Sequence, residues 1–287
     1  MTSGIFIKMK ELILNTSDQI QLSIKVFEPK ISNGKLLLIN SATGVKQQIY
    51  FSFANYFAEN GFTVITYDYR GIGELKPEKM NGFKASMRIW GTIDFKTVTD
   101  FIQHQYPDST TFCLGHSVGA LILGMNDYSQ NFEKFIFVGT QDAYVGNLNF
   151  SVAVTALLGF GLALPVMTHF FGYFPAHRFG LGESLPKGVA FDWQTLILSK
   201  KSTSKLYEKI GSNISKELKQ ETFIIHAEDD TWVTQKGMRN LLRYVYPNLK
   251  TEYREIKTSE SGKGEIGHVN FFRSYNRDLW KIILDQI

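Results

Sequence analysis

Short apolar runs recur along the chain and alternate with stretches whose apolar residues follow helical spacing. The first runs are KLLLIN at residues 35–40 and FTVITY at residues 62–67, both rich in branched side chains and bounded by turn residues. Between them, residues 47–61 carry apolar and aromatic side chains at helical spacing and end at Gly61, a usual helix stop. The pattern predicts a strand, helix, strand unit with buried parallel strands.

The same alternation continues toward the C-terminus. We expect further strands at residues 110–114, 135–138, 222–226 and 251–256, and helices at 89–105, from Val118, at 236–246 and at 269–287. Strands that alternate with helices form a parallel sheet covered on both faces, so the predicted fold class is α/β, with a mostly parallel, doubly wound sheet. Upstream, residues 6–27 alternate in part between apolar and polar side chains, which predicts an antiparallel hairpin at one sheet edge.

One segment interrupts this alternation. We therefore predict a core formed by residues 1–140 and 216–287, and an inserted helical cap at residues 141–215. The cap contains an uncharged run, residues 143–177, that is long enough to suggest a transmembrane helix. A membrane span there would separate Ser117 from the C-terminal residues that the chemistry below requires. The alternatives are a buried cap helix, which we favour, and a surface that docks reversibly on lipid.

Composition indicates an ordinary globular protein. The 287 residues are 44% hydrophobic and 20% charged, which excludes a disordered or fibrous chain. The net charge of +4 is modest, and we interpret a local group of lysines as a solvated face, namely Lys200, Lys201, Lys205, Lys209, Lys216 and Lys219. The single cysteine, Cys113, excludes a disulfide framework. The N-terminal residues lack an apolar stretch long enough for a secretion signal, so we expect a cytoplasmic location.

The motif that carries chemistry is Gly115-His116-Ser117-Val118-Gly119, which has the form G-x-S-x-G. It follows a predicted strand and precedes an apolar helix start, the context in which this motif forms a nucleophile elbow. Small residues two positions before and after the serine prevent a clash in the sharp turn, and the helix directs its positive end at the reacting oxygen. The context predicts that Ser117 is a nucleophile.

A serine nucleophile needs a histidine base, and the chain has six histidines. His268 alone follows the last predicted strand, at the end of a loop that can bring an imidazole to the strand ends. The others lie beside the serine, within a strand, at a helix end or in the insertion, namely His116, His226, His104, His169 and His177. We therefore predict that His268 is the general base.

The histidine needs an acid, which usually lies between serine and histidine in chain order. The segment AEDDTWV, residues 227–233, follows a predicted strand and offers three carboxylates. We favour Asp230 over its neighbour Asp229. Asp142, after the preceding strand, is a competing position that could reach the same histidine. The carboxylates that are not used are expected to be solvated in their loops.

These motifs together resemble the α/β-hydrolase superfamily. The resemblance is carried by KLLLIN followed by SATG, by TYDYRGIGE, by the elbow GHSVG, by HAEDDTWV and by IGHVNFF. The nearest likeness is to a broad bacterial branch related to monoacylglycerol-lipase-like and serine-aminopeptidase-like hydrolases, and LGESLPKGVAFDW in the insertion is similar to that branch as well. In two places the sequence departs from this pattern: Asn40-Ser41 stands where many relatives have His-Gly, and Glu74 stands where many have serine.

The resemblance implies the α/β-hydrolase fold, Asp230 as the acid, and an oxyanion hole made by backbone N–H groups. One donor is expected at Val118, directly after the nucleophile, and the other in the loop after KLLLIN, where Ala42 is the best position. Nothing in the sequence indicates a cofactor or a metal ligand set.

We expect a serine hydrolase that cleaves an ester-like acyl bond, as a carboxylesterase or lipase does, through an acyl-enzyme intermediate. The apolar insertion suggests a small-molecule substrate with an apolar acyl or aromatic part, and residues 143–177 are expected to line its pocket. An acyltransferase or thioesterase on the same fold, and a binding protein without turnover, are the alternatives. No nucleic-acid partner is expected, and transient membrane contact through the cap stays open.

Overall fold

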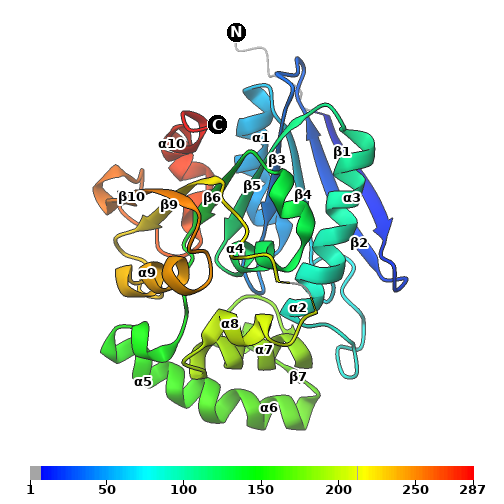
Figure 1. Cartoon of the computed structure of the whole chain (residues 1–287). Helices are drawn as coiled ribbons and strands as arrows, with labels where there is room; N and C mark the ends of the chain where they lie inside the picture. The colour runs from blue at the N-terminus through cyan, green and yellow to red at the C-terminus, as the bar shows by residue number, and fades with distance from the viewer. Residues whose placement is uncertain (1–7, 212) are drawn as a thin grey trace.

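The computed structural model describes residues 8–211 and 213–287. Figure 1 shows one twisted sheet with strand order β1-β2-β4-β3-β5-β6-β9-β10. The bounds of these strands are β1 (Lys8–Asn15), β2 (Gln21–Glu28), β3 (Lys35–Asn40), β4 (Thr63–Tyr67), β5 (Thr110–His116), β6 (Lys134–Val138), β9 (Glu221–Ala227) and β10 (Lys250–Ile256). β2 pairs antiparallel with β1 and β4, and the remaining neighbours are parallel. The predicted fold class is confirmed. Phe6 and Ile7, where the expected hairpin begins, lie outside the described residues.

Alternate side chains of the central strands enter two different cores. Leu36 and Leu38 of β3 pack in the core that includes residues of α3 (Phe95–Gln105) and α9 (Gln235–Tyr244). Leu37 and Ile39 enter the opposite core, with α1 (Phe51–Glu59) and the C-terminal turns. A strand buried on both faces has no polar side, which is why KLLLIN reads as a continuous apolar run.

Two of the expected helices have a different form. The helix predicted at 89–105 consists of α2 (Met87–Ile89), a π-helical turn (Trp90–Asp94) and α3. The helix predicted from Val118 is short, α4 (Val118–Leu121), and continues as a 3-10 turn (Ile122–Met125).

The single C-terminal helix predicted at 269–287 is wrong. The chain instead forms 3-10 turns at Asn270–Phe272 and Ser274–Trp280, followed by α10 (Lys281–Leu284). Asn276 has non-helical backbone angles, and its side-chain amide donates to the Asn270 carbonyl at 2.9 Å. The Trp280 indole donates to the Phe271 carbonyl at 2.6 Å. These side chains satisfy carbonyl groups that helical N–H groups would otherwise bind, so short turns replace a continuous helix.

Residues 141–215, which we call the inserted segment, lie between β6 and β9. They contain α5 (Phe150–Leu158), a π-helical turn (Gly159–Ala163), α6 (Leu164–Phe171), β7 (Tyr173–Phe174), β8 (Leu185–Pro186), α7 (Lys187–Leu198) and α8 (Ser202–Tyr207). α5, the π-helical turn and α6 form one 22-residue helix, Phe150–Phe171, at the edge of the molecule farthest from the sheet (Figure 1).

The helix Phe150–Phe171 is not the buried cap helix that we favoured from the sequence. By length and composition it could cross a membrane, but only 17% of its most apolar 18-residue window is buried. Composition alone could not reveal the exposure of this helix, because buried and exposed apolar helices can have the same composition.

Candidate active site

Ser117 lies at the turn between β5 and α4 with φ 53° and ψ −116°, a backbone conformation that residues other than glycine rarely adopt. The two flanking glycines explain how the turn fits. A Cβ atom at Gly115 would lie 2.5 Å from the Ala120 backbone, and one at Gly119 would lie 2.2 Å from the Asn40 carbonyl oxygen. The sequence G-x-S-x-G is therefore required by the close approach of backbone on both sides of the serine.

Neighbouring strands hold this strained turn in place. The Ser117 amide donates to the Val138 carbonyl at 2.9 Å, and the Thr140 hydroxyl donates to the Ser117 carbonyl at 2.9 Å. Asn40 donates its side-chain amide to the Gly119 carbonyl at 3.2 Å. Strain at one residue persists only where several such contacts determine the conformation. Asn40, one of the two departures from the family pattern, is thus part of the support of the elbow.

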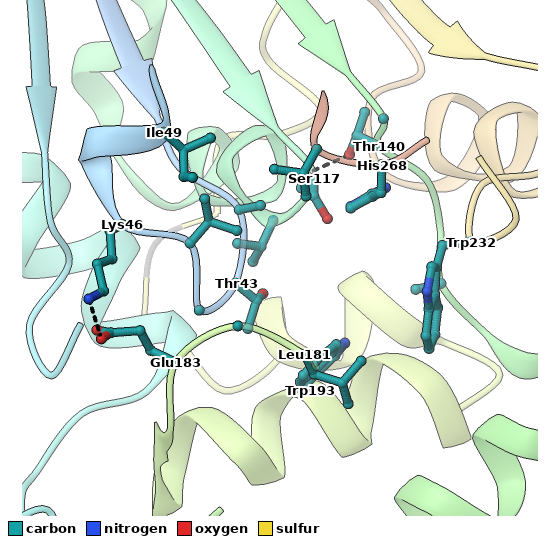
Figure 2. Close-up of a pocket in the computed structure, with 18 of the residues that line it drawn as sticks. Thr43, Lys46, Ile49, Ser117, Thr140, Leu181, Glu183, Trp193, Trp232 and His268 are labelled. Carbon is teal, nitrogen blue, oxygen red and sulfur yellow. Dashed lines mark hydrogen bonds and ion pairs between the residues drawn. The ribbon is translucent and has the colours of Figure 1, made fainter. Parts of the chain in front are cut away.

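His268 and Asp230 form a hydrogen-bonded pair next to the elbow. Nδ1 of His268 and Oδ2 of Asp230 are 2.7 Å apart, and Asp230 is 5% exposed. The other carboxylate oxygen of Asp230 accepts from the Trp232 amide at 3.0 Å. Ser117 and His268 line the same pocket, and Figure 2 shows their side chains near each other. No hydrogen bond joins the Ser117 hydroxyl to His268 among the described residues; such bonds often tighten only in the substrate complex.

The two alternative acids have other partners. The Asp142 carboxylate accepts from the Tyr144 amide at 3.3 Å and from Asn147 at 3.2 Å, and burial raises the pKa of Asp142. Asp229 accepts from two successive amides that directly precede His268, those of Ile266 at 2.9 Å and Gly267 at 2.8 Å. Neither carboxylate is the solvated loop residue that we expected. Asp229 instead shapes the loop that presents His268.

A buried chain of hydrogen bonds runs behind the pocket, and the sequence analysis missed it. The Ala42 amide donates to the Tyr50 hydroxyl at 3.0 Å, Tyr50 Oη lies 2.8 Å from His116 Nδ1, and His116 Nε2 lies 2.8 Å from the His268 carbonyl oxygen. A carbonyl only accepts, so Nε2 of His116 carries the proton and Nδ1 accepts from Tyr50. Burial, together with nearby His268, lowers the pKa of His116 well below its usual value, which keeps the ring neutral.

These hydrogen bonds change one expectation about the oxyanion hole. Val118 and Ala42 both line the pocket, as predicted. However, the Ala42 amide already donates to Tyr50, so it is not free for an oxyanion in this structure. The next residue, Thr43, also lines the pocket, and its side chain is directed into it in Figure 2. The loop is placed as the sequence predicted, but Thr43 replaces Ala42 as the candidate donor.

The pocket has a volume of about 950 Å³ and lies between the strand ends and the inserted segment. Its apolar lining comes from both parts of the chain: Leu121, Trp232 and Val233 from the core, and Leu181, Trp193, Leu196 and Ile197 from the inserted segment (Figure 2). Of the run at residues 143–177, only its ends, Ala143 and His177, line the pocket. The expectation that this run forms the pocket lining is therefore wrong, and the lining comes from the residues that follow it.

One wall of the pocket carries a cluster of charges around Glu183. Its carboxylate lies 3.0 Å from Lys46 Nζ and 2.9 Å from Lys76 Nζ, and it accepts from the Gly73 amide at 2.6 Å. Burial raises the pKa of Glu183, but the hydrogen bonds from Lys76, Gly73 and Lys46 outweigh it, so the net pKa is lowered. The Glu183 amide also donates to the Gly44 carbonyl at 2.8 Å. Glu183 therefore ties the inserted segment to the loop after β3.

Glu74, the second departure from the family pattern, lies away from this chemistry. Its carboxylate accepts from the Ser23 hydroxyl at 2.6 Å and pairs with Lys25 at 2.8 Å. Lys25 has a nearly buried side chain on β2, and its hydrogen bond lowers the pKa of Glu74. The glutamate therefore compensates a cation on the sheet and does not line the pocket.

Comparison with known proteins supports the fold and gives a partial family match. A family model described as serine aminopeptidase, S33, matches residues 34–170. An esterase from Pyrococcus furiosus, Pf2001, superposes with TM-score 0.58 and 14% identity, covering 97% of this chain and 90% of the esterase. An alpha-beta serine hydrolase homologue from Coxiella burnetii superposes with TM-score 0.56 and 12% identity, covering 97% of both chains. The chain therefore has the α/β-hydrolase fold, and residues 34–170 are similar to the serine aminopeptidase, S33, family.

A sequence relative is known from Escherichia coli, an "uncharacterized 31.7 kDa protein in traX-finO intergenic region". It is 38% identical over 63 residues, and the match spans 22% of this chain and 22% of the length of that relative.

Proposed function

We propose that the protein is a serine hydrolase that cleaves an ester-like acyl bond, with Ser117 as nucleophile, His268 as general base and Asp230 as the acid. The observation that carries this proposal is the 2.7 Å pair of His268 Nδ1 and Asp230, which opens on the same pocket as the strained Ser117. A carboxylate on Nδ1 fixes the tautomer in which Nε2 is free to accept a proton.

The reaction then follows from these positions. Ser117 Oγ attacks the carbonyl carbon of the substrate while its proton passes to His268 Nε2. The oxyanion accepts hydrogen bonds from the Val118 amide and the Thr43 amide, and the positive end of α4 adds to this stabilisation. His268 gives its proton to the leaving alcohol as the carbon–oxygen bond breaks. Water, deprotonated by His268, then attacks the acyl-enzyme and releases the acid.

The lining supports a substrate with an apolar acyl or aromatic part. Trp193, Leu196 and Ile197 form an apolar wall on the inserted segment, and Trp232 and Val233 face it from the core. Apolar surface buried in such a pocket stabilises binding by about 25 cal/mol per Å². Glu183 and Lys46 lie on the side of the pocket away from Trp232 (Figure 2), and Lys76 also pairs with Glu183, so a polar part of the substrate would bind on that side.

The test is hydrolysis of nitrophenyl esters of increasing acyl length by the wild type and by Ser117→Ala. We expect turnover that rises with acyl length until the pocket is filled, and a loss of at least about 10³ in kcat in the variant. Activity that survives in Ser117→Ala contradicts the proposal. Adding an alcohol or thiol acceptor separates the rival activities, because an acyltransferase then forms a new ester or thioester faster than the free acid. We keep a cytoplasmic location as part of the proposal.

A further inference from the structure

The helix Phe150–Phe171 exposes an unusually large apolar surface. Its most apolar window has a mean hydropathy of 2.0, and 17% of that window is buried. The exposed side chains lie along its whole length: Phe150, Val154, Leu157, Leu158, Leu162, Val166, Phe170 and Phe171. Contiguous exposed apolar patches on a monomeric protein are normally small, and a large one usually marks a surface that contacts something else.

The protein covers only one narrow stripe of this helix. Its buried residues are Ala156, Phe160, Leu164 and Thr168, which follow one another at four-residue spacing and so form one line along the helix. α7 covers that line: Gln194 donates to the Phe160 carbonyl at 2.7 Å, and Trp193 packs edge-on against the Phe160 ring. Half-buried residues flank this line, among them Val152, Ala163 and Met167, and the opposite side of the helix faces outward.

The segment that carries the helix has no acidic side chain, and a cation lies near each end of the helix. No aspartate or glutamate occurs from residue 143 to residue 182. At the first end, exposed Lys236 donates to the Gly146 carbonyl at 2.6 Å. At the other end, the exposed Arg178 guanidinium lies 5.5 Å from the centre of the Phe171 ring. No ion pair is formed by either cation among the described residues, so both are available to phosphate groups.

The segments at both ends of the helix are hydrogen-bonded to the α/β core. Just before it, the Thr234 hydroxyl donates to the Asn147 carbonyl at 2.7 Å, and Asn240 donates to the Asn147 side chain at 2.9 Å. Just after it, β7 pairs with β8, and Glu183 then binds the core loop at Gly44. A helix of this length is about 33 Å long, so a membrane-spanning orientation would require one of these ends to detach. The helix can meet a bilayer only lying in its plane.

We infer that Phe150–Phe171 is a membrane-docking surface that binds anionic phospholipid bilayers. The exposed side chains enter the boundary between headgroups and acyl chains, while Lys236 and Arg178 contact lipid phosphates at the two ends. An interface with a second copy of the chain would ordinarily have a polar rim around an apolar centre. Here the apolar surface runs around most of a convex helix without acidic side chains, which matches a fluid lipid surface. This inference does not depend on the catalytic proposal.

The experiment is flotation of the full chain with vesicles of phosphatidylcholine, with or without phosphatidylglycerol. The wild type should float with the anionic vesicles, and the bound fraction should fall as salt is raised because phosphate contacts are screened. The double variant Leu158→Asp/Phe170→Asp should bind at least about tenfold less, since it places two charges where apolar side chains enter the bilayer. Arg178→Gln/Lys236→Gln should lose the preference for phosphatidylglycerol.

The matched control is Ile31→Asp. Ile31 is 81% exposed and Phe170 is 80% exposed, but Ile31 lies in a loop between β2 and β3. Its flotation should equal that of the wild type. The circular dichroism spectrum and the Tm of every variant should match those of the wild type, which shows that each remains folded. Flotation that is absent in the wild type, or equal in Leu158→Asp/Phe170→Asp, overturns the inference. So does a concentration-dependent dimer in sedimentation velocity that this variant loses without any vesicle binding, because the partner is then a second copy.

Discussion

The catalytic side of the pocket and the outer helix of the inserted segment differ in whether their side chains find partners within the protein. Around Ser117 and His268, polar groups find their partners inside the chain: the Ser117 backbone is held from β6, and the His268 ring and carbonyl are held by Asp230 and His116. Along Phe150–Phe171, eight large apolar side chains are exposed to solvent. The polar groups of the first region have partners within the chain, whereas we propose that a lipid surface covers the apolar side chains of the second. The proposed chemistry thus depends on the core, whereas the proposed membrane contact depends on the inserted segment.

The largest expected effect separates the two candidate acids. Asp230→Asn should lower kcat by about 10³ to 10⁴, because an amide on Nδ1 favours the wrong histidine tautomer. Asp142→Asn should stay within about threefold of the wild type, because Asp142 contacts Tyr144 and Asn147 rather than His268. Steady-state ester hydrolysis of the two purified variants, with circular dichroism to verify folding, makes the comparison. The reverse ranking would move the acid to the loop after β6.

Removing the buried hydrogen bonds behind the pocket should lower kcat less than the loss of the Asp230 carboxylate does. Tyr50→Phe removes the hydroxyl that accepts from Ala42 and donates to His116. We expect kcat to fall by about tenfold with little change in KM, because the oxyanion loop and the His268 backbone lose their common support. Loss of a partner for two buried groups should also cost about 1–3 kcal/mol of unfolding free energy.

Tyr56→Phe is the control for this variant, since Tyr56 is on α1, which begins directly after Tyr50, and is only partly buried. It should leave both kcat and stability close to those of the wild type. If Tyr50→Phe loses stability but keeps the wild-type kcat, the hydrogen bonds through Tyr50 and His116 stabilise the fold but do not position His268.

The pocket lining gives a prediction that compares the two parts of the insertion. Trp193→Ala enlarges the apolar wall, so the preferred acyl chain should become longer, with about 0.8 kcal/mol of binding regained per added methylene. Leu158→Asp should leave the chain-length profile unchanged, because Leu158 is 63% exposed on the outer helix. The measurement is kcat/KM across nitrophenyl esters. An unchanged profile in Trp193→Ala would exclude this wall as the acyl site.

The smallest expected effect concerns the ion pairs of Glu183, which join the inserted segment to the core. Because the folded pKa of Glu183 is lowered from its ordinary value of 4.5, its ion pairs stabilise the fold above that pH and are lost as pH falls through the folded pKa. Glu183→Gln should therefore lower Tm at pH 7, and the gap to the wild type should close in acid, below about pH 4.5. Thermal melts of both proteins from pH 7 to pH 3 measure the gap. A gap that stays constant to pH 3 would show that the charge of Glu183 does not stabilise the fold.

The sequence predicted the sheet and the elbow because both depend on local patterns. Buried parallel strands require continuous apolar runs, and the backbone approach at Gly115 and Gly119 permits no side chain, so both leave marks in the sequence. Asp230 was predicted as the acid for a related reason, since it follows β9, which is parallel to β5 and ends at the same edge of the sheet.

The parts that were missed depend on contacts between distant residues. Tyr50 and His116 are 66 positions apart, and nothing near either of them in the sequence indicates the bond that takes the Ala42 amide out of the oxyanion hole. The last helix was wrong because the side chains of Asn276 and Trp280 bind carbonyl groups within it. The exposure of Phe150–Phe171 depends on what lies beside the helix, which apolar composition does not specify.

The most direct test of the catalytic account is covalent labelling by a fluorophosphonate, followed by intact mass and peptide mapping. The wild type should gain one adduct, on the peptide that contains Ser117, because the strained Ser117 lines the same pocket as His268, which pairs with Asp230. Ser117→Ala should gain none, and Asp230→Asn should react far more slowly. An adduct on another residue, or equal labelling of Ser117→Ala, would contradict the account.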